Sequence, residues 1–249
     1  MSIINQTLSD SPVNNTGLYD SSLEKDNCGV GFITRKDGVQ THDVLLKGHE
    51  ALCTIPHRGG MSAEGVGDGA GVSIDLSLAF FSRVTGLSLE AGRFGVGNFF
   101  LPSDVAAHAA AEDIIRKALA DKGLEVLQVR EVPVDNDAIR PAAVRYQLPI
   151  QQWIFAAPAS LDAQQFDRSI YQALLVIEEQ AYTTDSLAGL YPLSMSAHTQ
   201  VLKGRLNSNE VIPYFHDLMA EDHAVHTMYF HTRFSTNTDP HPSMAQLSA

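Results

Sequence analysis

A cysteine at the head of an apolar, glycine-containing stretch is the first residue in this sequence whose setting suggests chemistry. Cys28 follows a polar leader, residues 1–27, and directly precedes Gly29. If the chain is cut between Asn27 and Cys28, the cysteine carries both a thiol and a free α-amine. That amine, with a pKa near ~8, can accept the thiol proton close to neutral pH, and a thiolate is a strong nucleophile. Cys28 is therefore either an N-terminal nucleophile or a small buried hydrophobe, the commoner role of a free cysteine.

A glycine-dense segment, residues 57–71, is the second candidate. It does not match the G-x-G-x-x-G pattern, and it lacks the Gly-Lys-Ser/Thr ending of a phosphate-binding loop. Its first arginine, Arg58, offers a guanidinium that can hold a carboxylate through two parallel hydrogen bonds. Asp68 either pairs with an amine or serves as a turn residue. The glycines alone favour a wide surface turn.

A third candidate lies at 228–238, where apolar and polar residues alternate up to an arginine. The alternation places Met228, Phe230 and Thr232 on one face of an expected strand. Arg233 then stands near the strand end, and a hydroxyl-rich stretch that includes Thr236 follows it. An arginine in this setting suits recognition of a small zwitterion, and the alternative interpretation is a solvated strand end.

The bulk composition excludes several classes of protein. The chain has 249 residues, a net charge of −12 and 2 cysteines. Clustered Lys and Arg are needed to bind phosphates, so the acidic balance argues against a nucleic-acid or anionic-membrane partner. Two cysteines form no disulfide framework, and we find neither an apolar run long enough for a membrane span nor a secretory signal. We therefore expect a cytoplasmic protein.

A metal site is not expected either. Histidines gather toward the C-terminus, but their spacings match no metal motif. They are His216, His223, His226, His231 and His241.

Strands and helices intermingle without a regular alternation, which favours an α+β fold with antiparallel sheets. The expected strands cover residues 28–34, 72–74, 94–101, 124–134, 152–156, 191–203 and 228–234. Turn residues 35–38 favour a hairpin. The expected helices cover residues 45–54, 103–122, a segment after the Asp162 cap, and 212–219. The apolar stripe of the second helix is Val105, Ile114, Ile115 and Leu119, and that of the third is Phe166, Ile170, Leu174 and Ile177.

Taken together, the three segments resemble the class II glutamine amidotransferases, specifically the N-terminal domain of the glutamate synthase large subunit. The resemblance rests on Cys28-Gly-Val-Gly-Phe, on Pro56-His-Arg-Gly-Gly with Gly67-Asp-Gly-Ala-Gly, and on Phe230-His-Thr-Arg-Phe-Ser-Thr-Asn-Thr. These motifs follow in the order of the family, and the resemblance runs from about residue 17 to 246.

The resemblance implies an N-terminal-nucleophile fold, a four-layered αββα sandwich of antiparallel sheets. It divides the chain into a leader, residues 1–27, and an amidotransferase domain, residues 28–249. Cys28 would attack the side-chain amide of L-glutamine and form a thioester, releasing ammonia. Arg233 would bind the α-carboxylate with Thr236 beside it, and Arg58 would support the site around the nucleophile.

The resemblance also implies a partner. In the complete enzyme, ammonia passes to a synthase domain or subunit that carries FMN and an iron–sulfur cluster and acts on 2-oxoglutarate; no cofactor is expected on this chain. The family continues with an Asn-Gly pair that supplies the oxyanion hole, and this sequence contains no such pair. We therefore expect a domain incomplete at its C-terminus, with its last strands missing. Two alternatives stay open: a weak or inactive fragment that acts as a binding module, and an amidotransferase for another acceptor.

Overall fold

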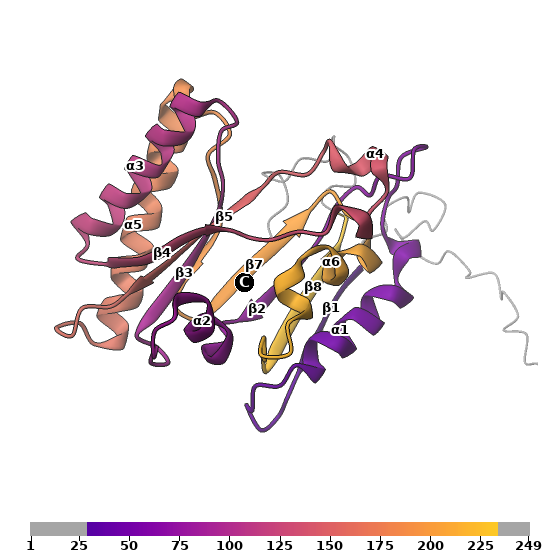
Figure 1. Ribbon diagram of the computed structural model, residues 1–249, viewed down its shortest axis with the longest axis horizontal. Coiled ribbons are helices and arrows are strands. Elements are labelled where there is room, and N and C mark those ends of the chain that lie inside the picture. Colours follow the sequence, from indigo (N-terminus) through magenta and orange to yellow (C-terminus); the bar gives the residue numbers. More distant parts are fainter. Residues whose placement is uncertain (1–28, 234–249) are drawn as a thin grey trace, which may run out of the picture.

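The computed structural model describes residues 29–233, which form two antiparallel sheets and the helices that pack on them (Figure 1). The strands of the first sheet, in the order β1-β8-β2-β7, are β1 (Gly29–Thr34), β8 (Thr227–Thr232), β2 (Ala70–Asp75) and β7 (Thr199–Gly204). Those of the second, in the order β4-β5-β3-β6, are β4 (Glu125–Glu131), β5 (Ile150–Ala156), β3 (Phe94–Phe100) and β6 (Tyr191–Ser196). The expected α+β class with antiparallel sheets is confirmed.

The helices of the described residues include both long amphipathic helices and short connecting turns. The α-helices are α1 (Asp43–Thr54), α2 (Leu78–Thr85), α3 (Val105–Asp121), α4 (Pro141–Val144), α5 (Ala163–Thr183) and α6 (Val211–Tyr214). The 3-10 turns are η2 (Pro56–Arg58), η3 (Asn136–Ala138), η4 (Asp185–Leu187), η5 (Ser208–Glu210) and η6 (His216–Met219). None of these described helices is long and apolar enough to cross a membrane.

Helices α3 and α5 lie side by side over the second sheet (Figure 1). The buried residues of α5 recur at helical spacing, which places them on one face against Trp153 and Phe155 of the sheet. Asp162 caps this helix as expected: its carboxylate accepts the Gln165 backbone N–H, while the Gln165 side chain accepts the backbone N–H of Asp162.

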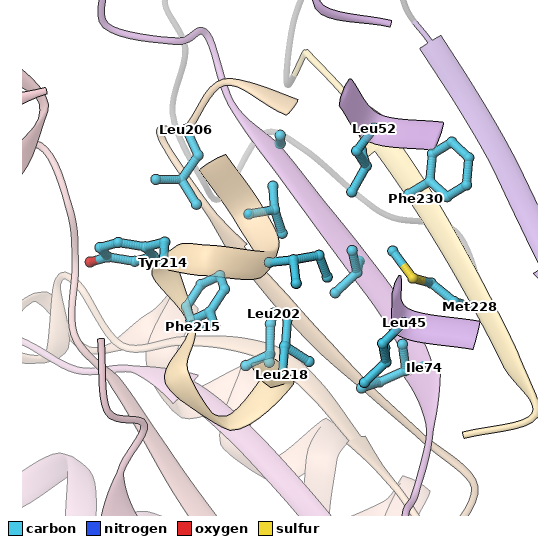
Figure 2. Packing of buried hydrophobic residues seen from close by; sticks show 14 of the residues in the cluster. Leu45, Leu52, Ile74, Leu202, Leu206, Tyr214, Phe215, Leu218, Met228 and Phe230 are labelled. Atoms are coloured by element: carbon cyan, nitrogen blue, oxygen red, sulfur yellow. The ribbon is translucent and has the colours of Figure 1, made fainter. Parts of the chain in front are cut away.

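Helix α1 covers the first sheet. In Figure 2, Leu45 lies beside Ile74 of β2, and Leu52 lies toward Phe230 of β8. These side chains are almost fully buried, so the apolar face of α1 fixes the position of the turn that follows it at Pro56–Arg58. Helices packed on both sheets are consistent with the layered N-terminal-nucleophile arrangement.

A buried polar network joins the second sheet to β7 and η6. The amide of Gln152 donates to Asn98 (2.9 Å) and to Gln200 (3.0 Å), and the guanidinium of Arg130 forms an ion pair with Asp217. Each of these polar groups has a partner, as burial requires.

His223 adjoins this network and is fully buried. Its ring stacks on Phe80 with centroids 4.1 Å apart, and its Nδ1 donates to the Asp217 carbonyl at 2.8 Å. Burial lowers the pKa of this imidazole to about 4, because a charge is unfavourable in an apolar setting. His223 is therefore neutral at physiological pH.

Several expected elements differ from the structure. Residues 191–203 are two strands in different sheets, because Ser196 closes a turn by accepting the backbone N–H groups of His198 and Thr199. The expected helix at 212–219 is broken into α6 and η6 at Phe215, whose backbone is extended.

Two further corrections concern turns and caps. The turn at 35–38 is present, with Gly38 in the left-handed region, but β1 pairs with β8, so the expected hairpin is wrong. Helix α3 is capped by Asp104 and not by Ser103, and Val105 is 84% exposed because it occupies the outward side of the first turn. Helix α2 was not expected, although Ser77 and Gly86 are an N-cap and a C-cap readable in sequence.

Candidate active site

One end of the first sheet gathers all three candidate segments. Strand β8 lies between β1 and β2, and the aligned residues at this end are Gly29, Thr232 and Ala70. Strand β1 begins just after Cys28, β2 begins inside the glycine-dense segment, and β8 ends just before Arg233. Positions more than 200 residues apart in sequence therefore become neighbours across one strand pair.

The turn after α1 lies against this end. A Cβ placed on Gly29 would lie 3.1 Å from Cβ of Arg58 and 3.2 Å from Cγ2 of Thr232. Arg58 is thus held beside the residue that follows Cys28. An open hollow of about 350 Å³ lies here, lined by residues of β1, α1 and β8 together with Ile55 and Arg58.

The glycine-dense segment folds back on itself, and its interpretation as a wide surface turn holds only for its exposed first part. Met61 and Gly67 form a β-bridge, and the Asp68 N–H donates to the Gly60 carbonyl at 2.9 Å. Residues 57–58 and 61–64 are exposed, whereas residues 65–67 and 69–71 are buried. A Cβ on Gly67 would lie 2.3 Å from the backbone oxygen of Leu206, so this close approach requires glycine.

Arg233 has a constrained backbone and a defined partner. Its φ of +80° places it in the left-handed region, which is uncommon for a residue with a side chain. Its backbone N–H donates to the Gly69 carbonyl at 2.5 Å. Its Nε lies 3.4 Å from Oδ2 of Asp68, and both side chains are 20% exposed. The predicted carboxylate-binding arginine is therefore held by the glycine-dense segment.

The alternation expected along β8 is confirmed for the described part. Met228, Phe230 and Thr232 are buried, whereas Tyr229 is 51% exposed. His231 lies on the same face as Tyr229, and its partial burial lowers the pKa of its imidazole.

The other histidines do not converge. His226 pairs with Asp75 (2.8 Å between Nδ1 and Oδ2), and His223 is stacked on Phe80. No group of three or more His, Cys, Asp or Glu suited to a metal ion occurs within residues 29–233.

Two of the expected site residues, Cys28 and Thr236, lie outside the described residues, as do the leader and His241. Of the others, the structure brings Arg58 and Arg233 to the same end of the first sheet.

Sequence reasoning left Asp68 open between pairing with an amine and a turn role, and it did not single out Lys203. Asp68 is the ion-pair partner of Arg233, and the signal available was its place in a Gly-Asp-Gly turn. Lys203 on β7 is buried, which lowers the pKa of its ammonium to about 8. Its Nζ lies 4.9 Å from the centroid of the Tyr191 ring, a cation–π contact.

Comparison with known proteins finds a matching family profile and several related proteins. Residues 28–248 match the profile of the family described as "Glutamine amidotransferases class-II". The chain is 34% identical over 230 residues to the glutamate synthase [NADPH] large chain of Bacillus subtilis, covering 90% of this chain and 15% of that protein. It is 31% identical over 237 residues to the glutamate synthase [NADH] of Schizosaccharomyces pombe, with 92% and 11% covered. It is 33% identical over 228 residues to ferredoxin-dependent glutamate synthase 2 of Synechocystis, with 90% and 14% covered. The chain thus spans a small part of the length of these relatives.

Proposed function

Since the chain belongs to the class II glutamine amidotransferases, we propose that it performs the glutaminase half-reaction of glutamate synthase. In this reaction L-glutamine is hydrolysed to glutamate and ammonia. The observation that carries the proposal is the convergence of the start of β1, the Pro56–Arg58 turn and Arg233 at one end of the first sheet. A family match that begins at residue 28 also supports cleavage after Asn27.

The proposed chemistry starts from a Cys28 that has become N-terminal. Its α-amine accepts the thiol proton, and the thiolate attacks the side-chain amide carbon of glutamine. The tetrahedral intermediate collapses with protonation of the leaving nitrogen, so ammonia departs and a γ-glutamyl thioester remains. Water then hydrolyses the thioester, releasing glutamate and restoring the thiol. Before cleavage the nitrogen of Cys28 is an amide and cannot act as a base, so leader removal switches the enzyme on.

The proposed substrate contacts use the two arginines at this end of the first sheet together with Thr236. The guanidinium of Arg233 binds the α-carboxylate of glutamine, because arginine pairs with carboxylates through parallel hydrogen bonds. Thr236 lies close behind it in sequence and completes this contact. Arg58, held beside Gly29, supports the backbone next to the nucleophile.

The ammonia is proposed to pass to a synthase domain or subunit that aminates 2-oxoglutarate. Support comes from relatives named as glutamate synthases, of which this chain covers 11% to 15%. FMN and an iron–sulfur cluster are expected on that part and none on this chain. We further propose a cytoplasmic location, without nucleic-acid or membrane partners. An amidotransferase serving another acceptor would share the same glutamine site.

The test combines intact mass with active-site labelling. The purified chain should lose Met1–Asn27, and a glutamine-analogue electrophile should label Cys28. Cys53, an exposed free cysteine, provides the matched control: Cys53→Ser should leave labelling by the analogue unchanged, while Cys28→Ser should abolish it. An uncut chain that resists the analogue would overturn the proposal and favour the inactive binding module.

Turnover distinguishes a competent from a weak enzyme. The 249 residues contain no Asn-Gly pair, and loss of an oxyanion donor typically lowers a rate by ~10²–10³. We therefore expect ammonia release from glutamine by this chain alone to be slower by about that factor than by a full-length relative. A turnover equal to that of the relative would show that another group supplies the oxyanion contact.

A further inference from the structure

The carboxylate of Asp68 fills the space beside Gly60 that a side chain at position 60 would occupy. The Asp68 N–H donates to the Gly60 carbonyl, and a Cβ built on Gly60 would lie 1.6 Å from Oδ2 of Asp68. The same Cβ would lie 3.2 Å from Nε of Arg233. The side of Gly60 that carries no side chain is therefore filled by the carboxylate of Asp68, with the guanidinium of Arg233 next to it.

Arg233 is held from two directions by the same loop. The Gly69 carbonyl accepts its backbone N–H, and Oδ2 of Asp68 lies 3.4 Å from its Nε. Both side chains of the ion pair are only 20% exposed, so solvent screens the pair less than a surface pair. A guanidinium has five N–H donors, so a contact at Nε is compatible with carboxylate binding through the Nη groups.

From this geometry we propose that Asp68 is a positioning residue: it orients the guanidinium of Arg233 toward the α-carboxylate of the substrate. The inference rests on the proposed function, because it assigns a role within the same glutamine site. Asp68 acts through Arg233 and touches no reacting atom. Gly60 contributes to this arrangement, because any side chain at position 60 would displace the carboxylate of Asp68.

The test compares two electrophiles on Asp68→Asn in a Cys53→Ser background. A glutamine-analogue electrophile needs the carboxylate contact, whereas iodoacetamide reacts with Cys28 without it. Labelling of Cys28 by the analogue should slow by about 10- to 100-fold, the range typical of a misplaced binding group, while labelling by iodoacetamide should not change. Asp37→Asn, which alters an exposed Arg–Asp pair on β1's turn, is the matched control and should change neither rate.

A second variant keeps the carboxylate but displaces it. Gly60→Ala should slow the analogue in the same way, because only the end of a side chain has to move. Gly59→Ala places a Cβ 3.3 Å from the Thr232 hydroxyl, away from Asp68, and should have little effect. Circular dichroism and thermal unfolding would establish that each variant is folded.

Testing Asp68→Asn in a second background, Arg233→Lys, distinguishes a positioning role of Asp68 from direct contact with the substrate. In an Arg233→Lys background, with the analogue labelling of Cys28 followed over long incubation, Asp68→Asn should add little further loss. If Asp68→Asn slows the analogue equally in both backgrounds, Asp68 acts on the substrate itself and the inference is overturned. An unchanged analogue rate in Asp68→Asn alone would overturn it as well.

Failure of the proposed function would look different. In that case the unmodified chain itself would not react with the analogue. The inference about Asp68 could then still be read from the Arg233 Nε–H resonance in NMR spectra, which should shift and exchange faster with water in Asp68→Asn. An unaltered resonance would refute positioning independently of glutamine chemistry.

Discussion

Replacing His223 by asparagine should make the folded protein less sensitive to acid. His223 is fully buried, its ring stacks on Phe80, and its Nδ1 donates to the Asp217 carbonyl. Burial is the main cause that lowers the pKa of this imidazole from 6.5 to about 4. Asparagine cannot titrate, and its Nδ2 retains a donor close to the position of the histidine Nδ1.

The direction of the effect follows from proton linkage. Between pH 6.5 and pH 4 the unfolded chain binds a proton at His223 that the folded chain does not bind. The free energy of unfolding therefore falls as the pH falls through this window. The whole shift corresponds to about 3 kcal/mol, of which about 2 kcal/mol would be lost between pH 7.5 and pH 5.0.

Urea unfolding at those two pH values measures the effect. The loss of stability on acidification should be about 2 kcal/mol larger for the unmodified chain than for His223→Asn. His198→Asn changes an exposed histidine paired with Asp167, so that variant should retain the full acid sensitivity assigned to His223. If the unmodified chain and His223→Asn lose the same stability between the two pH values, the assignment to His223 is wrong.

Three further predictions concern the contacts that hold the site and the core. Gly67→Ala should destabilise the fold by about 1–3 kcal/mol. The new Cβ would lie 2.3 Å from the Leu206 carbonyl oxygen, and a backbone atom cannot move away without disturbing its neighbours. An unchanged melting temperature would contradict this prediction. Arg130→Met should cost about 3–5 kcal/mol in urea unfolding, since it leaves the mostly buried Asp217 without its ion-pair partner. The double variant Arg130→Met with Asp217→Leu should recover part of that loss, and no recovery would argue against an uncompensated charge as the cause. Asp162→Ala should cost about 1 kcal/mol by removing the α5 capping box, with faster amide exchange at Gln165; unaltered exchange would count against the cap.

Local patterns predicted much of the fold. Strands β1, β3 and β8 and helices α1 and α5 lie where apolar periodicity and capping residues indicated them. These signals are local, since a period of two or of 3.6 residues and a cap such as Asp162 depend on near neighbours in sequence. Burial of Phe166, Ile170 and Ile177 on one face of α5 confirms that interpretation.

Two of the failures have a non-local cause. The local pattern predicts one strand over residues 191–203, yet β6 pairs with β3 and β7 pairs with β2. The choice of sheet depends on partners distant in sequence, which no window of neighbouring residues contains. The burial of residues 65–67 in the glycine-dense segment is likewise not predicted by local pattern, because the contact of Gly67 with Leu206 joins residues far apart in the chain.

The sequence by itself determined the family, the order of its motifs and the residue types that can act on glutamine: a cysteine after a leader, Arg58 and Arg233. Only the tertiary structure decided that Arg233 is held by Asp68 and that Arg58 stands beside Gly29. The first arrangement exists because β8 pairs with β2, which begins inside the glycine-dense segment, and the second because α1 packs on the same sheet. Such strand pairing depends on the packing of the first sheet under α1, which joins segments far apart in sequence. These contacts stabilise the fold only after the distant segments have come together.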